Sequence, residues 1–171
     1  MNRINRILQH RQYKDYVGRI EEYEKDRIFC KHDMGHFLDV CRLAEILYLQ
    51  ECLGEIQIST VFQNAKFKEG IYAAGLLHDI GRWQEYETGI CHETASAELA
   101  TDILSDCGFS YEESEEILKA IRNHRNKEIK EEVSLSGILY RADKMSRACF
   151  SCKAEAECDW DIQKKNMEIV F

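Results

Sequence analysis

The chain contains no proline among its 171 residues and only nine glycines. These two residues interrupt helices more often than any others, so little breaks a regular backbone here. Residues that favour helices, such as Leu, Ala, Glu and Lys, are abundant. The length suits one compact domain with a core large enough to need no disulfides. We therefore predict an all-α fold, a single helical bundle.

Hydrophobic residues recur at helical spacing in several segments. Val40 and Leu43, for example, follow His36 on one face of a predicted helix, and Ser134 is a suitable N-cap for a later one. The predicted helices cover 2–28 (one or two helices), 36–53, 66–79, 93–107, 110–125, a segment that starts at 134, and a short segment over 161–167. The pattern of residues 56–64 is ambiguous and is compatible with a turn and a short helix. Residues 82–91 are expected to form a loop.

No repeat, low-complexity tract or linker divides the chain. We expect residues 1–27 to form a helical extension that packs on the same domain. Residues 28–150 would form the core of that domain, and residues 151–171 a C-terminal tail or helix.

The chain carries a formal net charge of −8. Such a chain repels nucleic-acid phosphates in general, which argues against a broad nucleic-acid-binding surface. A small phosphorylated substrate stays possible, because it needs only a local positive site. No segment approaches the roughly 18 apolar residues of a membrane span, and the first ten residues lack the apolar region of a signal peptide. We expect a cytoplasmic protein that binds no membrane and whose eight cysteines are free thiols.

The most informative pair in the sequence is His78-Asp79, at the end of an apolar segment that contains Gly75. A buried carboxylate without a partner is strongly destabilising, and a metal ion is a natural partner. Adjacent helix residues diverge by about 100°, yet both can reach an ion that lies over the edge between them. The two carboxylate oxygens can also bridge two ions. Gly75 would permit close helix packing near this site.

Further candidate ligands lie at the ends of core-facing helical stripes: His36, His92, His124 and Asp143. A lone histidine on an apolar face is more often a core residue whose hydrogen bonds are satisfied. Six chemically suitable residues, each at the start or end of a stripe, favour a shared metal site instead.

The order of these residues resembles the HD-domain superfamily of metal-dependent phosphohydrolases, over about residues 28–150. The His78-Asp79 doublet after an apolar helix, followed by Ile-Gly and a basic residue, is a fairly specific signal. Members with one early His, the doublet and a late Asp hold one metal, whereas members with two additional His usually hold two. His92 and His124 correspond to that second type. The resemblance implies an all-α HD-type bundle with a buried metal site.

The resemblance also implies a division of roles. The ligands of the first ion would be His36, His78, Asp79 and Asp143. His92 and His124 would hold the second ion, with Asp79 bridging. Divalent Fe, Mn, Co, Ni or Zn suits imidazole and carboxylate ligands. The expected reaction is attack of a metal-bound hydroxide on the phosphorus of a phosphoester or phosphoanhydride.

Basic residues beside the ligands are candidates for binding a phosphorylated substrate. Arg82 would project over the site if the helix before it continued for one more turn, and a planar guanidinium can hold two phosphate oxygens. We take Asp79 and Arg82 as candidate catalytic residues. The candidate substrate-binding residues are His32, Arg82, Lys144 and Arg147. Surface ion pairs are the alternative for the three cations, and an exposed loop position is the alternative for His32.

Cys149-x-x-Cys152, with Cys158 nearby, resembles part of a zinc knuckle. A structural zinc site needs four ligands, usually from two such pairs. Only three cysteines lie close together in this part of the sequence, which argues against a zinc site there.

Among HD proteins, enzymes that hydrolyse cyclic dinucleotides carry a Gly-Tyr-Pro signature, which a chain without proline lacks. Alarmone hydrolases use a Glu-Asp pair that is absent between residues 79 and 143. The spacing and the segment Ala142-Asp143-Lys144 are similar to symmetrical dinucleoside-tetraphosphate hydrolases, so we expect a nucleotide or nucleoside polyphosphate substrate. Two alternatives stay open: a di-iron HD-type oxygenase with the same six ligands, and a non-catalytic nucleotide-sensing or binding module.

Overall fold

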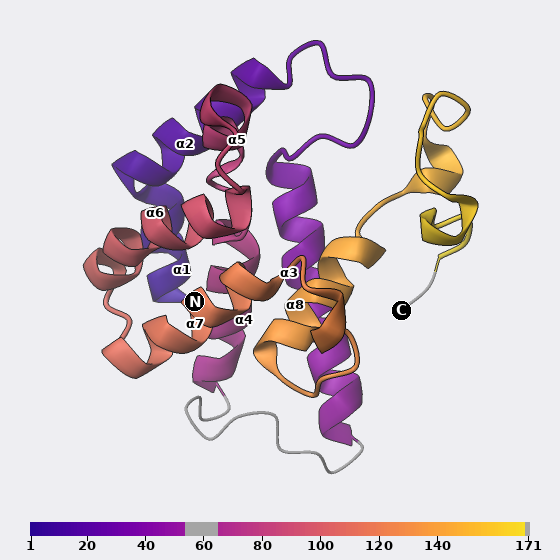
Figure 1. Cartoon of the computed structure of the whole chain (residues 1–171). Coiled ribbons are helices and arrows are strands. Elements are labelled where there is room, and N and C mark those ends of the chain that lie inside the picture. Colours follow the sequence, from indigo (N-terminus) through magenta and orange to yellow (C-terminus); the bar gives the residue numbers. More distant parts are fainter. Residues whose placement is uncertain (54–64, 170–171) are drawn as a thin grey trace.

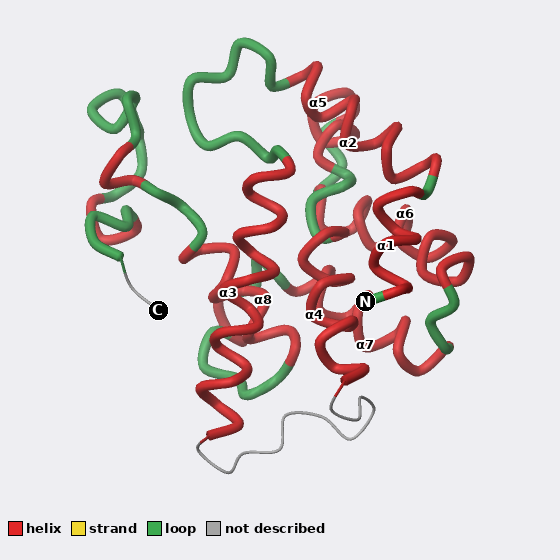
Figure 2. Tube along the Cα trace, turned by 180° about the vertical axis from the view of Figure 1, so that it is seen from behind, coloured by secondary structure: helices red, strands yellow, loops and turns green. Residues whose placement is uncertain are grey.

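The computed structural model describes residues 1–53 and 65–169, and this part of the chain contains helices and loops but no strand (Figure 2). The predicted all-α class is confirmed. The α-helices are α1 (Asn2–Gln9), α2 (Arg11–Tyr23), α3 (Met34–Leu53), α4 (Ala65–Leu77), α5 (Arg82–Thr88), α6 (His92–Cys107), α7 (Tyr111–Asn123) and α8 (Leu135–Met145). Short 3₁₀ helices are η1 (Lys127–Ile129), η2 (Cys149–Ser151) and η3 (Ile162–Lys164).

Helix α4 lies at the centre of the bundle (Figure 1). It contacts α3 and α8 on one side, α6 and α7 on another, and α1 on a third. Helix α2 packs against α5 and α1. The residues that follow α4 are therefore placed where several helices meet. None of the described helices is both long and apolar enough to cross a bilayer.

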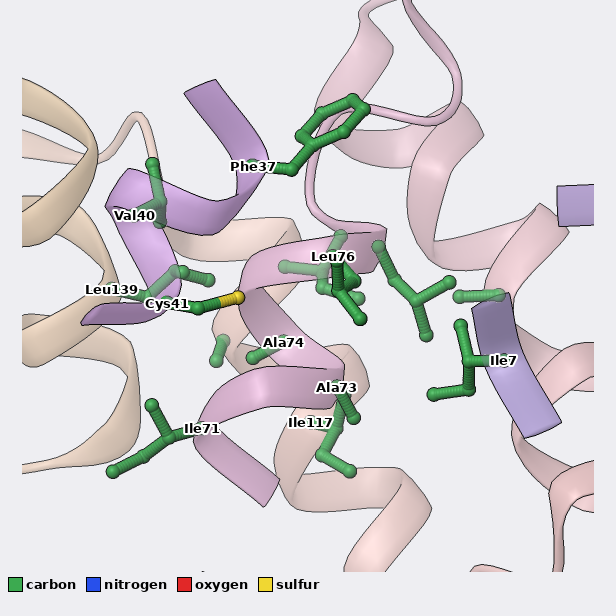
Figure 3. Packing of buried hydrophobic residues seen from close by; sticks show 14 of the residues in the cluster. Ile7, Phe37, Val40, Cys41, Ile71, Ala73, Ala74, Leu76, Ile117 and Leu139 are labelled. Carbon is green, nitrogen blue, oxygen red and sulfur yellow. The ribbon is translucent and has the colours of Figure 1, made fainter. Parts of the chain in front are cut away.

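The sequence of α4 explains its central position. Ile71, Ala73, Ala74 and Leu76 are fully buried, and Figure 3 shows them among side chains from α1, α3, α7 and α8. Consecutive helix residues point about 100° apart, so this run covers every side of the helix with apolar groups. A helix that is hydrophobic all round belongs in the interior of a bundle.

Gly75 allows α3 and α4 to approach closely. A Cβ atom there would lie 2.6 Å from the Cys41 sulfur and 3.2 Å from the Cys41 Cα. Both distances are shorter than ordinary contacts, so only glycine fits without a shift of one helix. The expected close packing at Gly75 is confirmed.

Several expected boundaries are confirmed. Residues 2–28 contain two helices, and Ser134 caps α8 by accepting a hydrogen bond from the Gly137 amide. Ser110 caps α7 through a reciprocal capping box with Glu113. The expected ambiguous segment 56–64 lies outside the described residues.

Three expectations about elements were wrong. Residues 82–91 do not form a loop throughout, because α5 occupies Arg82–Thr88. Helix α4 ends at Leu77, so His78 and Asp79 lie in the turn after it rather than on it. The segment 161–167 forms only η3, a single 3₁₀ turn. Helix α5 has just seven residues between two glycines, and Gly89 adopts the left-handed conformation that ends it.

Candidate metal centre

The structure brings all six predicted ligands together, although they come from five places along the chain. His36 lies in the first turn of α3 and His92 begins α6. His124 follows the last residue of α7, and Asp143 lies in the last turn of α8. Their ligating atoms form two groups: His36, His78 and Asp143, and Asp79, His92 and His124. Within each group these atoms lie within 4.8 Å of one another.

Asp79 lies between two pairs of imidazoles. Its Oδ1 is 3.1 Å from Nε2 of His92 and 3.5 Å from Nε2 of His124. Its Oδ2 is 3.3 Å from Nε2 of His78 and 3.6 Å from Nε2 of His36. Each oxygen of this one carboxylate therefore faces its own pair of histidines.

Backbone carbonyls determine the tautomers of two buried histidines. Nδ1 of His78 lies 2.8 Å from the Gly75 oxygen, and Nδ1 of His124 lies 2.7 Å from the Ile121 oxygen. A carbonyl oxygen can only accept, so each Nδ1 carries the proton and donates it. In the neutral rings, Nε2 keeps a lone pair that faces Asp79.

Side chains, rather than backbone carbonyls, determine the tautomers of His92 and His36. Nδ1 of His92 lies 2.6 Å from a carboxylate oxygen of Glu85. Nδ1 of His36 lies 3.2 Å from the Ser146 hydroxyl oxygen, whose own proton is donated to the Asp143 carbonyl at 2.7 Å. The hydroxyl oxygen therefore accepts from His36. Such partners on the distal nitrogen are the usual supports of metal-binding histidines.

The Nε2 atoms at the centre of the cluster consequently carry no protons of their own, although Nη1 of Arg82 lies 3.3 Å from Nε2 of His92. The Nε2 atoms of His36 and His78 are 3.3 Å apart, as are those of His92 and His124. Lone pairs at this separation repel. Oδ1 of Asp79 is also buried without a hydrogen-bond partner. A set of imidazole and carboxylate ligands suits divalent transition metals, and cations would satisfy every unpaired atom, so these residues fit metal ions.

The charges of the cluster are consistent with cation binding. Burial opposes ionisation of Asp79, yet the His78 and His32 imidazoles hold the pKa of its carboxyl well below its usual range. Burial likewise opposes ionisation of Asp143, and Lys144 keeps the pKa of that carboxyl low. For His124, burial lowers the pKa and favours the neutral ring. The carboxylates are thus charged at neutral pH, as metal ligands must be.

The pKa of His78 shifts in the opposite direction to that of His124. Burial alone would lower its pKa, but the carboxylates of Asp79 and Asp143 raise it. A proton and a cation therefore compete for the same Nε2 atom.

His32 lies beside this cluster, with its Nε2 3.6 Å from Oδ2 of Asp79. Its Nδ1 lies 2.5 Å from Oε1 of Glu24, and its backbone amide donates to Oε2 of the same carboxylate at 2.6 Å. Tyr86 donates a further hydrogen bond to Glu24. The side chain of His32 is 13% exposed, so it is a partly buried neighbour of the ligands rather than an exposed loop residue.

The three predicted basic residues lie in different surroundings. Arg82 begins α5 instead of extending α4, and its Nη1 lies 3.0 Å from Nδ1 of His92. Lys144 forms an ion pair with the Asp143 carboxylate. Arg147 lies over the ring of Trp160, with 3.8 Å between Cζ and the ring centroid. Arg82 and Lys144 thus adjoin the ligands, whereas Arg147 contacts the C-terminal tail.

Sequence reasoning missed the residues that position the ligands, namely Glu24, Glu85, Tyr86 and Ser146. Glutamates are frequent in this chain, and nothing in the sequence distinguishes these two from exposed ones. Glu85 lies on α5, which was expected to be a loop. Ser146, three residues after Asp143, could have been found as a hydroxyl close to a predicted ligand.

Comparisons with known proteins agree with this geometry. The HD domain family matches residues 33–148. An uncharacterized protein of Clostridium beijerinckii is 42% identical over 171 residues, which covers the full length of both chains. No solved structure matches the chain significantly.

Proposed function

Because this chain belongs to the HD domain family, we propose that it is a metal-dependent phosphohydrolase that acts on a small phosphorylated substrate through two divalent ions. The observation that carries this proposal is the position of Asp79, whose two oxygens face separate pairs of histidines. A carboxylate in this position is the usual bridge of two-metal hydrolytic sites. His36, His78 and Asp143 would complete one ion's ligands, and His92 and His124 the other's.

Divalent ions bound there would supply a hydroxide nucleophile at neutral pH and offset the charge that develops on the phosphoryl oxygens. The ligand types suit Fe, Mn, Co, Ni or Zn. The bonds from Nδ1 of each histidine keep the four Nε2 atoms oriented before any ion arrives.

The residues at the exposed edge of the cluster are basic, which suits an anionic substrate. The side chains of His78, His92 and His124 are at most 2% exposed. By contrast, His32 is 13% exposed, Arg82 16% and Lys144 31%. A substrate would therefore reach the ligands past basic groups, and Arg82 would orient its phosphate with a planar guanidinium.

His32 would move a proton during the reaction. Its Nδ1–H is held by Glu24, so the lone pair on Nε2 faces the site. Burial lowers the pKa of His32, which leaves the ring neutral at neutral pH and able to accept the proton that the attacking water gives up. Glu24 would stabilise the imidazolium that forms, and His32 would then donate the proton to the leaving group. The expected substrate, a nucleotide or nucleoside polyphosphate, offers such a leaving group.

The test is a substrate panel on metal-loaded protein without oxygen. It would include a chromogenic phosphomonoester, nucleoside mono-, di- and triphosphates, and a symmetrical dinucleoside tetraphosphate, each with Mn²⁺ or Co²⁺. We expect phosphate or nucleotide release by the wild type. Asp79→Ala should lose both turnover and metal at the histidine cluster while keeping its helical circular dichroism.

Other outcomes would contradict the proposal. Turnover only with iron and oxygen would indicate an oxygenase. Tight nucleotide binding without any release of product would indicate a binding module. Full metal retention by Asp79→Ala would show that the histidines do not share ions through this carboxylate.

A further inference from the structure

The C-terminal lobe (residues 148–169) is folded but has almost no core of its own. Its helical structure is limited to η2 and η3, of three residues each. Ala154 is the one buried apolar side chain among its described residues. Larger apolar groups are exposed instead, and they include Phe150, Trp160, Ile162, Met167 and Ile169. A segment this short buries too little apolar surface to offset the conformational entropy that it loses on folding. Small units of this kind are commonly stabilised by disulfides or metals.

Polar contacts attach the lobe to the bundle without replacing a core. The Asn166 side chain donates to the carbonyl oxygens of Lys144 and Arg147 at the end of α8. Within the lobe, the Phe150 amide donates to the Asn166 oxygen at 3.0 Å. Lys165 pairs with Glu155 at 2.7 Å. These bonds join the lobe to the bundle and its last residues to its first half, but they bury little apolar surface.

The first half of the lobe contains three cysteines in turns. Cys149 and Cys152 lie at the two ends of a single turn, closed by a hydrogen bond from the Cys152 amide to the Cys149 oxygen at 3.1 Å. Cys158 closes a second turn through its amide and the Glu155 oxygen. A turn with cysteines three residues apart is the common half-site of structural zinc. None of these cysteines forms a disulfide within the described chain.

The structure adds a fourth cysteine that is distant in sequence. The loop between α2 and α3 extends towards the lobe (Figures 1 and 2) and contains Cys30, whose carbonyl is held by Arg27 at 2.8 Å. Burial raises the pKa of Cys30; Arg147 opposes this shift, and Cys149 and Cys152 add to it. These charges act on Cys30 across the gap between the loop and the lobe. No group of three or more ligating atoms within 4.8 Å among the described residues includes a cysteine, so zinc would have to draw the loop and the lobe together. The sequence around residues 149–158 contains only three cysteines, which is one too few for structural zinc. Cys30, on the loop before α3, would supply the fourth.

We propose that Cys30, Cys149, Cys152 and Cys158 form a structural zinc site that ties the C-terminal lobe to the loop before α3. Four thiolates complete the tetrahedral shell of structural zinc and leave no open position for catalysis. Binding releases the four thiol protons and leaves a net charge of −2 on the site, which follows from Zn²⁺ and about four thiolate charges.

Nearby cations suit that charge. Arg147 lowers the pKa of Cys30 against the effect of burial, and the lobe's Lys165 interacts with both Cys149 and Cys158. Nη1 of Arg147 is buried without a hydrogen-bond partner, so it is free to receive a thiolate. These cations offset only part of the effect of burial, since the pKa of Cys30 stays above its ordinary value; a bound metal would favour the thiolate form further.

The site would also order the entrance to the histidine cluster. Cys30 precedes His32 by two residues, and His32 lies 3.6 Å from Asp79. Zinc would fix the loop at one end, while the hydrogen bonds to Glu24 fix it at the other. This role does not depend on which reaction the histidine cluster performs.

The experiment uses the full-length protein, with zinc and cobalt as probes. We expect wild-type protein, purified under reducing conditions, to release zinc when a mercurial reagent titrates its thiols. Cobalt should give the sulfur-to-metal charge-transfer absorption and the intense visible bands of a tetrahedral four-sulfur site. Cys30→Ser and Cys149→Ser should each lose about one equivalent of zinc and this absorption. Cys91→Ser, which changes an exposed thiol outside the group, should keep both.

Each alternative result would overturn the proposal. These results are no charge-transfer absorption in the wild type, an unchanged spectrum in Cys30→Ser, a Cys149–Cys152 disulfide, or iron with acid-labile sulfide in place of zinc. The histidine cluster contains no sulfur, so it cannot produce the absorption. Since the lobe contains no α-helix, circular dichroism at 222 nm should stay unchanged in the variants and shows that the bundle is intact.

Discussion

Glu85 orients His92, a candidate metal ligand, without being a candidate ligand itself. Its carboxylate accepts the Nδ1 proton of His92 at 2.6 Å, which leaves Nε2 free to bind a cation. The ligands themselves could be predicted from the sequence, because each lies at the end of an apolar stripe where an unpaired imidazole or carboxylate is unexpected. Glu85 could not, since an acid on a short helix looks like any surface glutamate until the fold brings it to His92.

We predict that Glu85→Gln lowers metal affinity by about 10- to 100-fold, the usual effect of losing such a partner. A glutamine can present its amide hydrogens to Nδ1 and favour the wrong tautomer. The measurement is competition of Mn²⁺ or Co²⁺ against a chromophoric chelator. Glu93→Gln is the matched control, because Glu93 lies 3.8 Å from the same nitrogen and makes no hydrogen bond to it. Equal losses in both variants would show that overall charge matters rather than this bond.

Glu24 should make the fold sensitive to acid. Burial opposes its ionisation, but hydrogen bonds from His32 and Tyr86 lower its pKa from 4.5 to about 2. A carboxyl whose pKa is lower in the folded state stabilises the fold above its unfolded pKa. That contribution is lost progressively as the pH falls from 4.5 to about 2.

We therefore expect Glu24→Gln to lower the free energy of unfolding by about 2 kcal/mol near neutral pH. The difference from wild type should shrink below pH 4.5 and be nearly gone at about 2. Urea unfolding at several pH values measures both. Glu22→Gln, at an exposed position in α2 two residues before Glu24, should behave like wild type throughout. A difference that stays constant with pH would contradict the role given to the Glu24 carboxylate.

Among the elements, α4 was the easiest to predict and α5 the hardest. The long apolar run of α4 identifies it as a central helix, since no amphipathic surface helix contains such a run. The end of α4 was less predictable, because no proline or glycine stands between Leu77, where the helix stops, and Gly81. Helix α5 is too short for a periodic pattern. Arg82 is therefore placed differently from the prediction: it begins α5 beside His92 instead of extending α4.

The close approach of α3 and α4 at Gly75 can be tested by adding a methyl group there. We predict that Gly75→Ala destabilises the protein by about 2 kcal/mol, because the added methyl group would overlap Cys41. Gly18→Ala is the matched control. Gly18 lies exposed within α2, and a Cβ there meets nothing within 4 Å, so alanine should raise the free energy of unfolding by about 1 kcal/mol. Thermal unfolding measures both, and a neutral Gly75→Ala would contradict the close approach.

At the scale of the whole molecule, the histidine cluster links otherwise separate parts of the bundle. The ligands come from α3, α6 and α8 and from the ends of α4 and α7, so bound cations would connect helices that are far apart in sequence. Anything that binds the folded but not the unfolded chain stabilises the fold by mass action. The all-α class and the convergence of the ligands were both predictable. The position of α2 against α5 was not, because α5 was expected to be a loop and its Trp83 therefore offered no helical face for Tyr16 and Arg19 of α2.

We predict that Mn²⁺ at about 100 times its dissociation constant adds about 2.7 kcal/mol of stability, which raises the melting temperature by roughly 5 to 10 °C. Mn²⁺ is the suitable ion because it prefers nitrogen and oxygen ligands over thiolates. Asp79→Asn, which keeps the shape of the side chain, should show little or no rise. The effect should also weaken under mildly acidic conditions, where protons compete for the imidazoles. An equal rise in wild type and variant would place the stabilising ion elsewhere.

Asp79 is the one side chain whose two oxygens face both histidine pairs. Loss of His92 and His124 would therefore still leave His36, His78, Asp79 and Asp143 as four candidate ligands around one cation. The reverse loss would leave a pair of imidazoles and one carboxylate with nothing to anchor them from α3 or α8. The two halves of the cluster are thus unequal, because four of the six side chains can surround one cation and only three can surround the other.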